Sequence, residues 1–240
     1  MTRALAPETA VKLARWAGFL YLVVIVCGLL AELAVRQALI VPGDAAATAA
    51  NIGAAEGRFR LGLAADAAMG LADAGLGVLL FVLLRPVGAI LSLAALVFRL
   101  AQTAIVGMTL ILSQAALLAL DGVAGDGGEG LAALLLAAHG LGYDTGLAFF
   151  GVACGLLGLL VWRSGYLPRW LGALLAAAGA VYLTGSALRL VAPGLSGAFA
   201  PAYALPLLAE AAFCLWLLIR GVDRAGWARA VSAPDRNPPR

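Results

Sequence analysis

Six stretches of this sequence are long enough and apolar enough to cross a lipid bilayer. A transmembrane helix needs about 20 mainly apolar residues, because the hydrocarbon core is roughly 30 Å thick. The six stretches lie near residues 14–37, 57–84, 87–119, 131–162, 170–191 and 203–220. Backbone groups in lipid must form their hydrogen bonds within the protein, and a helix does so within a single segment. The sequence therefore predicts an all-α fold, a polytopic membrane bundle of six transmembrane helices.

The composition agrees with this class along the whole chain. Hydrophobic residues make up 63% of the 240 residues and charged residues 12%, whereas soluble domains have about 45–50% apolar and about 25% charged residues. We predict a cytoplasmic segment at 1–13, a transmembrane domain at 14–222 and a disordered cytoplasmic tail at 223–240. Residues 44–55 are predicted to form a short interfacial helix capped by Asp44.

Arginine and lysine indicate the orientation, because short cytoplasmic loops carry an excess of both. The basic residues near the termini and in the second and fourth connections are Arg3, Lys12, Arg15, Arg85, Arg163, Arg169, Arg220, Arg224, Arg229, Arg236 and Arg240. The third connection carries the acidic residues Asp121, Asp126 and Glu129. We predict a multi-pass protein of the cell membrane with both termini in the cytoplasm.

Charged and hydrogen-bonding residues recur in the middle and outer parts of the six stretches. A charge that faces lipid costs at least a few kcal/mol, so these side chains are expected to face the bundle interior. They predict a polar chamber that opens outward above an apolar cytoplasmic half. Its predicted binding residues are Glu32, Arg36, Asn51, Glu56, Arg60, Asp66, Arg99, Gln102, Tyr143, Tyr182 and Arg189.

Counting along the helices places two oppositely charged pairs at equal depth. Asp73 lies about as far before the predicted turn at 85–86 as Arg99 lies after it, near mid-membrane. Asp144 and Arg189 are level by the same count, near the outer boundary. Because an unpaired buried charge is costly, we predict that Asp144 contacts Arg189. For the same reason Arg99 is expected to pair with an acid at its own depth, either Asp73 or Glu210.

Four residues are candidates for catalysis. A carboxyl group buried at mid-membrane holds its proton more readily and can act as a general acid, which points to Asp73 and Glu210. His139, the single histidine, and Asp144 are further candidates, and His139 shares a helix face with Tyr143. A structural, hydrogen-bonded role for His139 remains equally open.

Other site classes lack support in the sequence. One histidine without a cysteine partner predicts no metal site. The chain shows neither a phosphate-binding loop nor a dinucleotide fingerprint, so no cofactor is predicted. It also shows no basic patch interleaved with aromatic residues, so no nucleic acid is predicted as a partner.

Several blocks of the sequence resemble one known family. The most specific are "VPGDAAATAANI" and "HGLGYDTGLAFFG", and "RSGYLPRWLG" and "LWLLIRGV" add to them. With these blocks the chain resembles, from about Ala14 to Val222, bacterial membrane proteins grouped as domain of unknown function 4386. The resemblance implies a multi-helix membrane domain and no particular reaction.

The residues favour two classes of function. An apolar floor below a polar, acidic mouth suits a membrane-embedded enzyme or binder for an amphiphilic or isoprenoid-like molecule. Buried carboxylates paired with arginines are also common in small-solute and proton-coupled transporters, although the cytoplasmic half offers few polar groups. A sensor or scaffold whose ion pairs are purely structural is a third reading. The predicted partners are the lipid bilayer and an amphiphilic ligand, and a homo-oligomer is left open.

Overall fold

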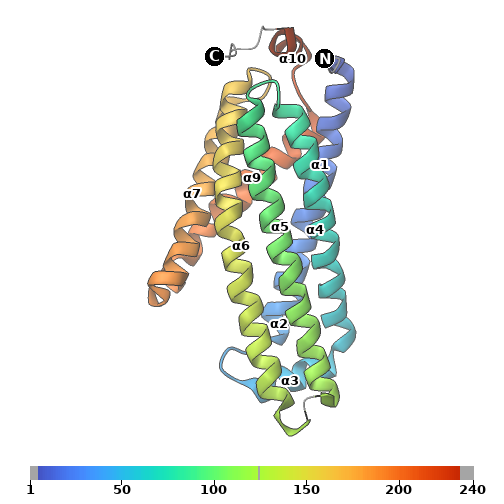
Figure 1. Ribbon diagram of the computed structural model, residues 1–240, viewed down its shortest axis with the longest axis vertical. Helices are drawn as coiled ribbons and strands as arrows, with labels where there is room; N and C mark the ends of the chain where they lie inside the picture. Colours follow the sequence, from blue (N-terminus) through green and yellow to red (C-terminus); the bar gives the residue numbers. More distant parts are fainter. Residues whose placement is uncertain (1–4, 124, 233–240) are drawn as a thin grey trace.

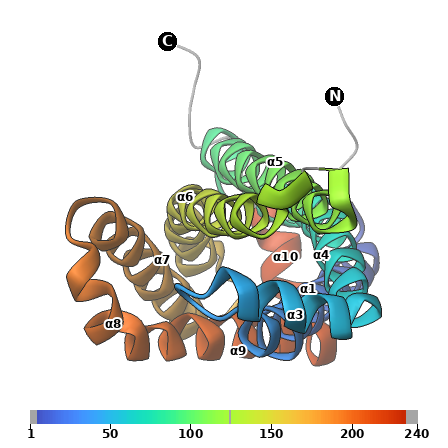
Figure 2. The same ribbon diagram turned by 90° about the horizontal axis from the view of Figure 1, so that it is seen from below.

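The computed structural model describes residues 5–123 and 125–232, and six long helical rods in it form a closed ring (Figures 1 and 2). The rods are α1 (Pro7–Leu29) with its continuation to Leu39, α4 (Glu56–Leu84), α5 (Ala89–Leu118), α6 (Gly128–Ser164), α7 (Arg169–Val191) and α9 (Ala204–Ile219). Each rod packs against the next along the chain, and α9 closes the ring against α1. All six spans are long and apolar enough to cross a membrane, which confirms the predicted six-helix bundle.

The first rod contains a wider helical turn where Glu32 and Arg36 lie. A π-helix at Leu30–Arg36 follows α1 and leads into α2 (Gln37–Leu39). π-Helical turns are rare, and they occur often at functional sites. The rod also begins at Pro7, earlier than the predicted residue 14, because proline suits the first position of a helix. Among the other rods, α6 extends past its predicted stretch at both ends, whereas α9 is one residue shorter than its predicted stretch at each end.

Short elements lie at the end of the bundle opposite the chain termini (Figure 1). The predicted interfacial helix is present as α3 (Ala45–Ala54), and the Asp44 side chain accepts a hydrogen bond from the Ala47 backbone N–H at 2.9 Å. We call this end the α3 end and the opposite one the terminus end. The segment before α9 comprises two 3-10 turns, Pro193–Leu195 and Ala200–Tyr203, and α8 (Ser196–Phe199).

The tail differs from the prediction over the residues that the structure describes. Residues expected to be disordered form α10 (Arg224–Ser232), whose Trp227 side chain is only 1% exposed. Trp227 packs on the Tyr166 ring and donates its indole N–H to the Leu5 carbonyl oxygen at 3.1 Å. Burial raises the pKa of Tyr166, whose phenol donates to the Leu83 carbonyl. The helix is thus fastened by one aromatic anchor. Residues 233–240 and Arg3 lie outside the described part of the chain.

Two apolar clusters hold the ring together. The larger one, at the terminus end, includes the buried side chains Tyr21, Leu76, Leu171, Phe213 and Leu217. A smaller cluster at the α3 end includes Val35, Phe59 and Leu136. Between these clusters the ring interior contains the polar side chains described below.

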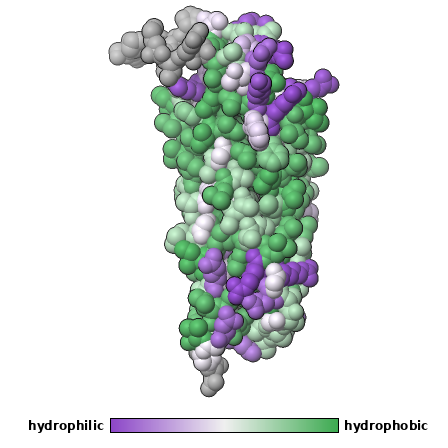
Figure 3. All heavy atoms as spheres, turned by 90° about the vertical axis from the view of Figure 1, so that its right-hand side faces the viewer, coloured by the Kyte–Doolittle hydropathy of each residue, from purple (hydrophilic) through white to green (hydrophobic). Residues whose placement is uncertain are grey.

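Polar and apolar residues are distributed over the outer surface as in a membrane protein. On the face that Figure 3 shows, apolar residues form a broad band and polar residues gather toward the two ends. The exposed Glu56, Arg58 and Arg60 belong to the polar group at the α3 end, at the start of α4. Long side chains there can reach the headgroup region.

The orientation remains a prediction, with a direct test. In a variant whose Cys27, Cys154 and Cys214 are replaced by alanine, a cysteine is introduced either at Asp121 or at Arg229, which are both exposed. A membrane-impermeant maleimide should label position 121 in intact cells and position 229 only after lysis, because arginine-rich ends stay in the cytoplasm. The reverse labelling pattern would contradict this orientation.

Candidate functional site

An ion pair lies in the middle of the bundle, between α4 and α5. The Arg99 guanidinium bonds the Asp73 carboxylate, and these residues are 3% and 4% exposed. The Thr103 hydroxyl donates to the other Asp73 oxygen at 2.8 Å. The contact predicted from equal depth is therefore present, and both oxygens of Asp73 are bonded.

Glu210 of α9 lies in the same interior but has different partners. Its two carboxyl oxygens accept hydrogen bonds from the phenols of Tyr182 at 2.5 Å and Tyr21 at 3.2 Å. The guanidinium carbon of Arg99 lies 5.4 Å from the centre of the Tyr21 ring and 5.1 Å from that of Phe150. Such cation–π contacts stabilise a buried guanidinium. Arg99 therefore pairs with Asp73, while its contact with the Glu210 group runs through the Tyr21 ring.

A second charged cluster lies nearer the α3 end. Arg36 donates to Glu32 at 2.8 Å and to Asp66 at 2.6 Å, so it joins the π-helical turn of the first rod to α4. Its guanidinium carbon lies 5.6 Å from the centre of the Tyr143 ring on α6. The cluster thus connects three rods.

His139 and Asp144 lie on α6 but serve different neighbours. His139 Nδ1 lies 3.0 Å from the Thr109 carbonyl oxygen and 3.0 Å from the Ser113 hydroxyl, both on α5. Asp144 forms the predicted contact with Arg189 of α7 at 2.9 Å, and it is only partly buried. The tyrosine predicted beside His139 does stack with it, at 6.3 Å between the ring centres of His139 and Tyr143.

Some predicted chamber residues lie elsewhere. Glu56 and Arg60 form an exposed ion pair at the first turn of α4, at 2.6 Å. Asn51 donates to the Leu39 carbonyl and connects α3 to the first rod. The expected single chamber is therefore divided into a mid-bundle group, an α3-end cluster and the lateral Asp144–Arg189 pair.

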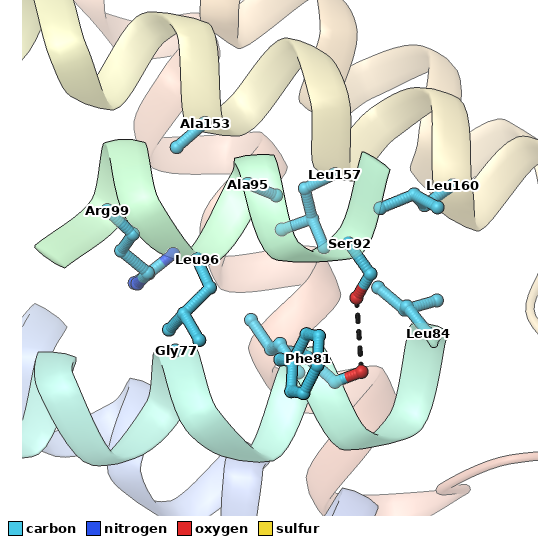
Figure 4. Close-up of a pocket in the computed structure, with 11 residues that line it drawn as sticks. Gly77, Phe81, Leu84, Ser92, Ala95, Leu96, Arg99, Ala153, Leu157 and Leu160 are labelled. Atoms are coloured by element: carbon cyan, nitrogen blue, oxygen red, sulfur yellow. Dashed lines mark hydrogen bonds between the residues drawn. The ribbon is translucent and has the colours of Figure 1, made fainter. Parts of the chain in front are cut away.

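A pocket opens beside the mid-bundle ion pair, on its terminus side. It contains about 290 Å³ of empty space, part of it open to the surface, between α4, α5 and α6. In Figure 4, Arg99 lies at one end and Leu84 and Leu160 lie at the other, and the residues between them include Leu96, Leu157 and Ser92. The Arg99 Nε atom is buried and has no hydrogen-bond partner among the described residues.

Sequence reasoning missed several members of these groups. Tyr21, Thr103 and Phe150 surround Arg99, and Ser113 contacts His139. Thr103 follows Arg99 by one helical turn, so it shares the same face and could have been found by that spacing. The other contacts join rods that are distant in sequence, and spacing along one helix does not reveal them.

Candidate metal sites were searched among the described residues. No cluster of three or more His, Cys, Asp and Glu side chains there could hold a metal ion. Cys154 and Cys214 are buried and Cys27 is partly buried, all as free thiols.

Comparison with known proteins shows which family the sequence belongs to. The family described as domain of unknown function (DUF4386) matches residues 16–221. An archaeal relative, described as an uncharacterised protein of Archaeoglobus fulgidus, is 40% identical over 78 residues, which cover 32% of this chain and 45% of the relative. The matched part is thus less than half of that relative's length. No solved structure matches the chain. The chain is therefore a multi-pass membrane protein that belongs to the DUF4386 family.

Proposed function

We propose that this protein binds an amphiphilic or isoprenoid-like molecule within the bundle and acts on its head by carboxyl acid–base chemistry. One observation carries the proposal. The apolar pocket of Figure 4 ends at Arg99, a buried cation whose Nε–H is left without a partner among the described residues. A buried donor without an acceptor costs about 1–3 kcal/mol, and an oxygen atom of a ligand would remove that cost.

The shape of the pocket suits an apolar chain. Seven residues of α5 separate Ser92 from Arg99, which corresponds to about 10 Å along a helix. Ala95 and Leu96 line the pocket and are partly exposed, so the bilayer can supply a ligand from the side. A hydrocarbon segment would lie along these residues with its oxygen-bearing head at Arg99.

Glu210 does not line the pocket, but its hydrogen-bond partners make it the better of the two buried acids for proton transfer in this proposal. Asp73 is bonded to the guanidinium of Arg99, whereas the hydrogen-bond partners found for Glu210 are two neutral phenols. Two acids in such different surroundings divide naturally into a counter-ion and a proton donor. We assign the counter-ion role to Asp73 and the acid role to Glu210.

A mass-spectrometric inventory of co-purifying small molecules tests the binding. Wild-type protein should carry one amphiphile in excess over the bulk lipids, and Ala95→Phe, which fills the pocket, should reduce it at least tenfold. Leu93→Phe is the matched control, because Leu93 is exposed on the same helix. Equal recovery from both variants would place the ligand elsewhere and contradict the proposal.

The same inventory separates an enzyme from a binder. Glu210→Gln keeps a hydrogen-bonding side chain of the same length but removes the transferable proton. If the protein transforms its ligand, the variant should retain substrate while the wild type carries product, so the two molecules differ in mass. Identical molecules would leave binding as the activity and exclude the acid role of Glu210.

Transport is the competing class of function. The charged groups occupy the middle of the bundle and the α3 half, whereas the pocket toward the terminus end is apolar along most of its lining. A polar solute would meet this apolar lining, which argues against transport. Ligand accumulation in proteoliposomes, absent in Ala95→Phe, would favour transport instead.

A further inference from the structure

A second pocket lies at the α3 end, enclosed by the first rod, α4, α5 and α6. It contains about 280 Å³ of empty space, part of it open to the surface. Its walls are mainly apolar and include Val35, Ile40, Phe59, Leu63 and Leu136. Among these walls lie three buried polar side chains, Asp66, Ser113 and His139, which are 3%, 4% and 4% exposed.

Two of these side chains, Asp66 and His139, each have one polar atom without a hydrogen-bond partner among the described residues. Asp66 bonds Arg36 through Oδ2, and its Oδ1 is buried without a hydrogen-bond partner among the described residues. His139 uses Nδ1, and its Nε2 is likewise buried and unpartnered in the described chain. Two orphaned polar atoms in one pocket cost about 1–3 kcal/mol each, so they point to a bound group.

The hydrogen bonds of His139 determine what its free nitrogen can do. Nδ1 lies 3.0 Å from the Thr109 carbonyl oxygen, which can only accept. We assign the proton of the neutral imidazole to Nδ1, because it then donates to this carbonyl oxygen while the Ser113 hydroxyl, also at 3.0 Å, can accept. With this tautomer Nε2 presents a lone pair. The pocket thus offers two acceptors, Asp66 Oδ1 and His139 Nε2.

The charge around the pocket favours a cation. Asp66 and Arg36 line the pocket with one charge of each sign, and Glu32, which bonds Arg36 from outside the lining, adds a second negative charge. A ligand that matches this site carries a positive charge and at least two N–H or O–H donors. A single hydroxyl group has one proton and can satisfy only one of the two acceptors.

We propose that this pocket binds the protonated amino group of a small organic amine. Two of its N–H groups would donate to Asp66 Oδ1 and His139 Nε2, and its apolar part would pack against Val35, Phe59 and Leu136. This site is separate from the pocket at Arg99, which matches an oxygen-bearing head. The inference therefore does not depend on the proposed function.

The single histidine gives a direct readout in the full-length protein. Protein labelled with ¹⁵N-histidine, purified through a tag without histidine and placed in nanodiscs, has one imidazole signal pair. The free protein should show the Nδ1–H form. Hexylamine at pH 7 should shift the Nε2 signal saturably, whereas hexyltrimethylammonium, with the same charge and chain but no N–H, should bind at least tenfold more weakly.

Two variants test whether the Asp66 carboxylate takes part in hexylamine binding. Asp66→Asn removes the charge at nearly constant shape and should weaken hexylamine binding at least tenfold. Glu56→Gln removes an exposed charge at the start of the same helix and should leave binding unchanged. If Asp66→Asn does not fold, the comparison of the two probes on wild-type protein still decides.

Three results would overturn the proposal. Equal affinity for hexylamine and its trimethyl analogue would show that N–H donors are not recognised. An Nε2 signal that hexylamine does not move would mean that water alone fills the pocket. Unchanged binding in Asp66→Asn would place the amine at another site.

Discussion

Replacing Arg99 with alanine is expected to destabilise the protein by about 3–5 kcal/mol. The substitution removes the counter-charge of Asp73, which is 4% exposed in the middle of the bundle, and leaves Thr103 as its remaining hydrogen-bond donor among the described residues. It also removes the guanidinium from its contacts with the rings of Tyr21 and Phe150. The measurement is the unfolding free energy, or the thermal midpoint, of the purified protein in detergent.

Double substitutions show which acid Arg99 serves. Because the ion pair joins Arg99 to Asp73, adding Asp73→Asn to Arg99→Ala should recover part of the lost stability. Adding Glu210→Gln should recover much less, since Glu210 is bonded to Tyr21 and Tyr182 instead. Strictly additive losses in the Asp73 combination would show that the ion pair contributes no coupling.

Lysine at position 99 gives a further check on the geometry. Arg99→Lys keeps the positive charge but loses the planar guanidinium that stacks on two rings. We expect an intermediate stability, between those of the wild type and of Arg99→Ala. A fully stable lysine variant would mean that charge alone matters and that the ring contacts contribute little.

The depth of a residue along its helix could be predicted from the sequence. This depth indicated which charged residues of neighbouring helices lie level with each other. The pairs Asp73–Arg99 and Asp144–Arg189 are connected by short turns, so equal distance from the turn places their residues at equal height. The six spans could be predicted for the same reason, because a bilayer demands long apolar segments whatever their neighbours are.

Rotation around each helix axis could not be predicted in the same way. Glu56 and Arg60 were expected in a central chamber, but they form an exposed ion pair at the first turn of α4. In lipid both faces of a helix are apolar, so a sequence pattern carries little information about which face is interior. The division of the polar residues into separate groups therefore required the structure.

Two contacts that the sequence reasoning missed, those of Trp227 and Tyr21, show a related limit of prediction from sequence. Trp227 fixes α10 through Tyr166 and Leu5, which are distant in sequence. Tyr21 meets Glu210 across the closure of the ring between α1 and α9. Such contacts follow from the cyclic order of the rods, and local composition around 224–232 favoured a disordered tail.

The close approach of α6 and α7 leads to the second large effect, at Gly158. A methyl group added there would lie 2.6 Å from the backbone nitrogen of Ala176 and 2.6 Å from the carbonyl oxygen of Gly172. Backbone atoms cannot turn aside as a flexible side chain can, so the two helices would have to separate. We expect Gly158→Ala to destabilise the protein by about 2–3 kcal/mol, as overpacking of a tight contact does.

Gly155 provides the matched control on the same helix, one turn away. A methyl group added at Gly155 meets no atom within 4 Å, so nothing obstructs it. Alanine is favoured over glycine inside a helix by about 1 kcal/mol, so Gly155→Ala should be neutral or slightly stabilising. The two variants carry the same chemical change, and only the neighbouring backbone differs. Thermal midpoints that fall equally in both would mean that helix α6 tolerates no added methyl, and that the backbone contact with α7 is not the cause.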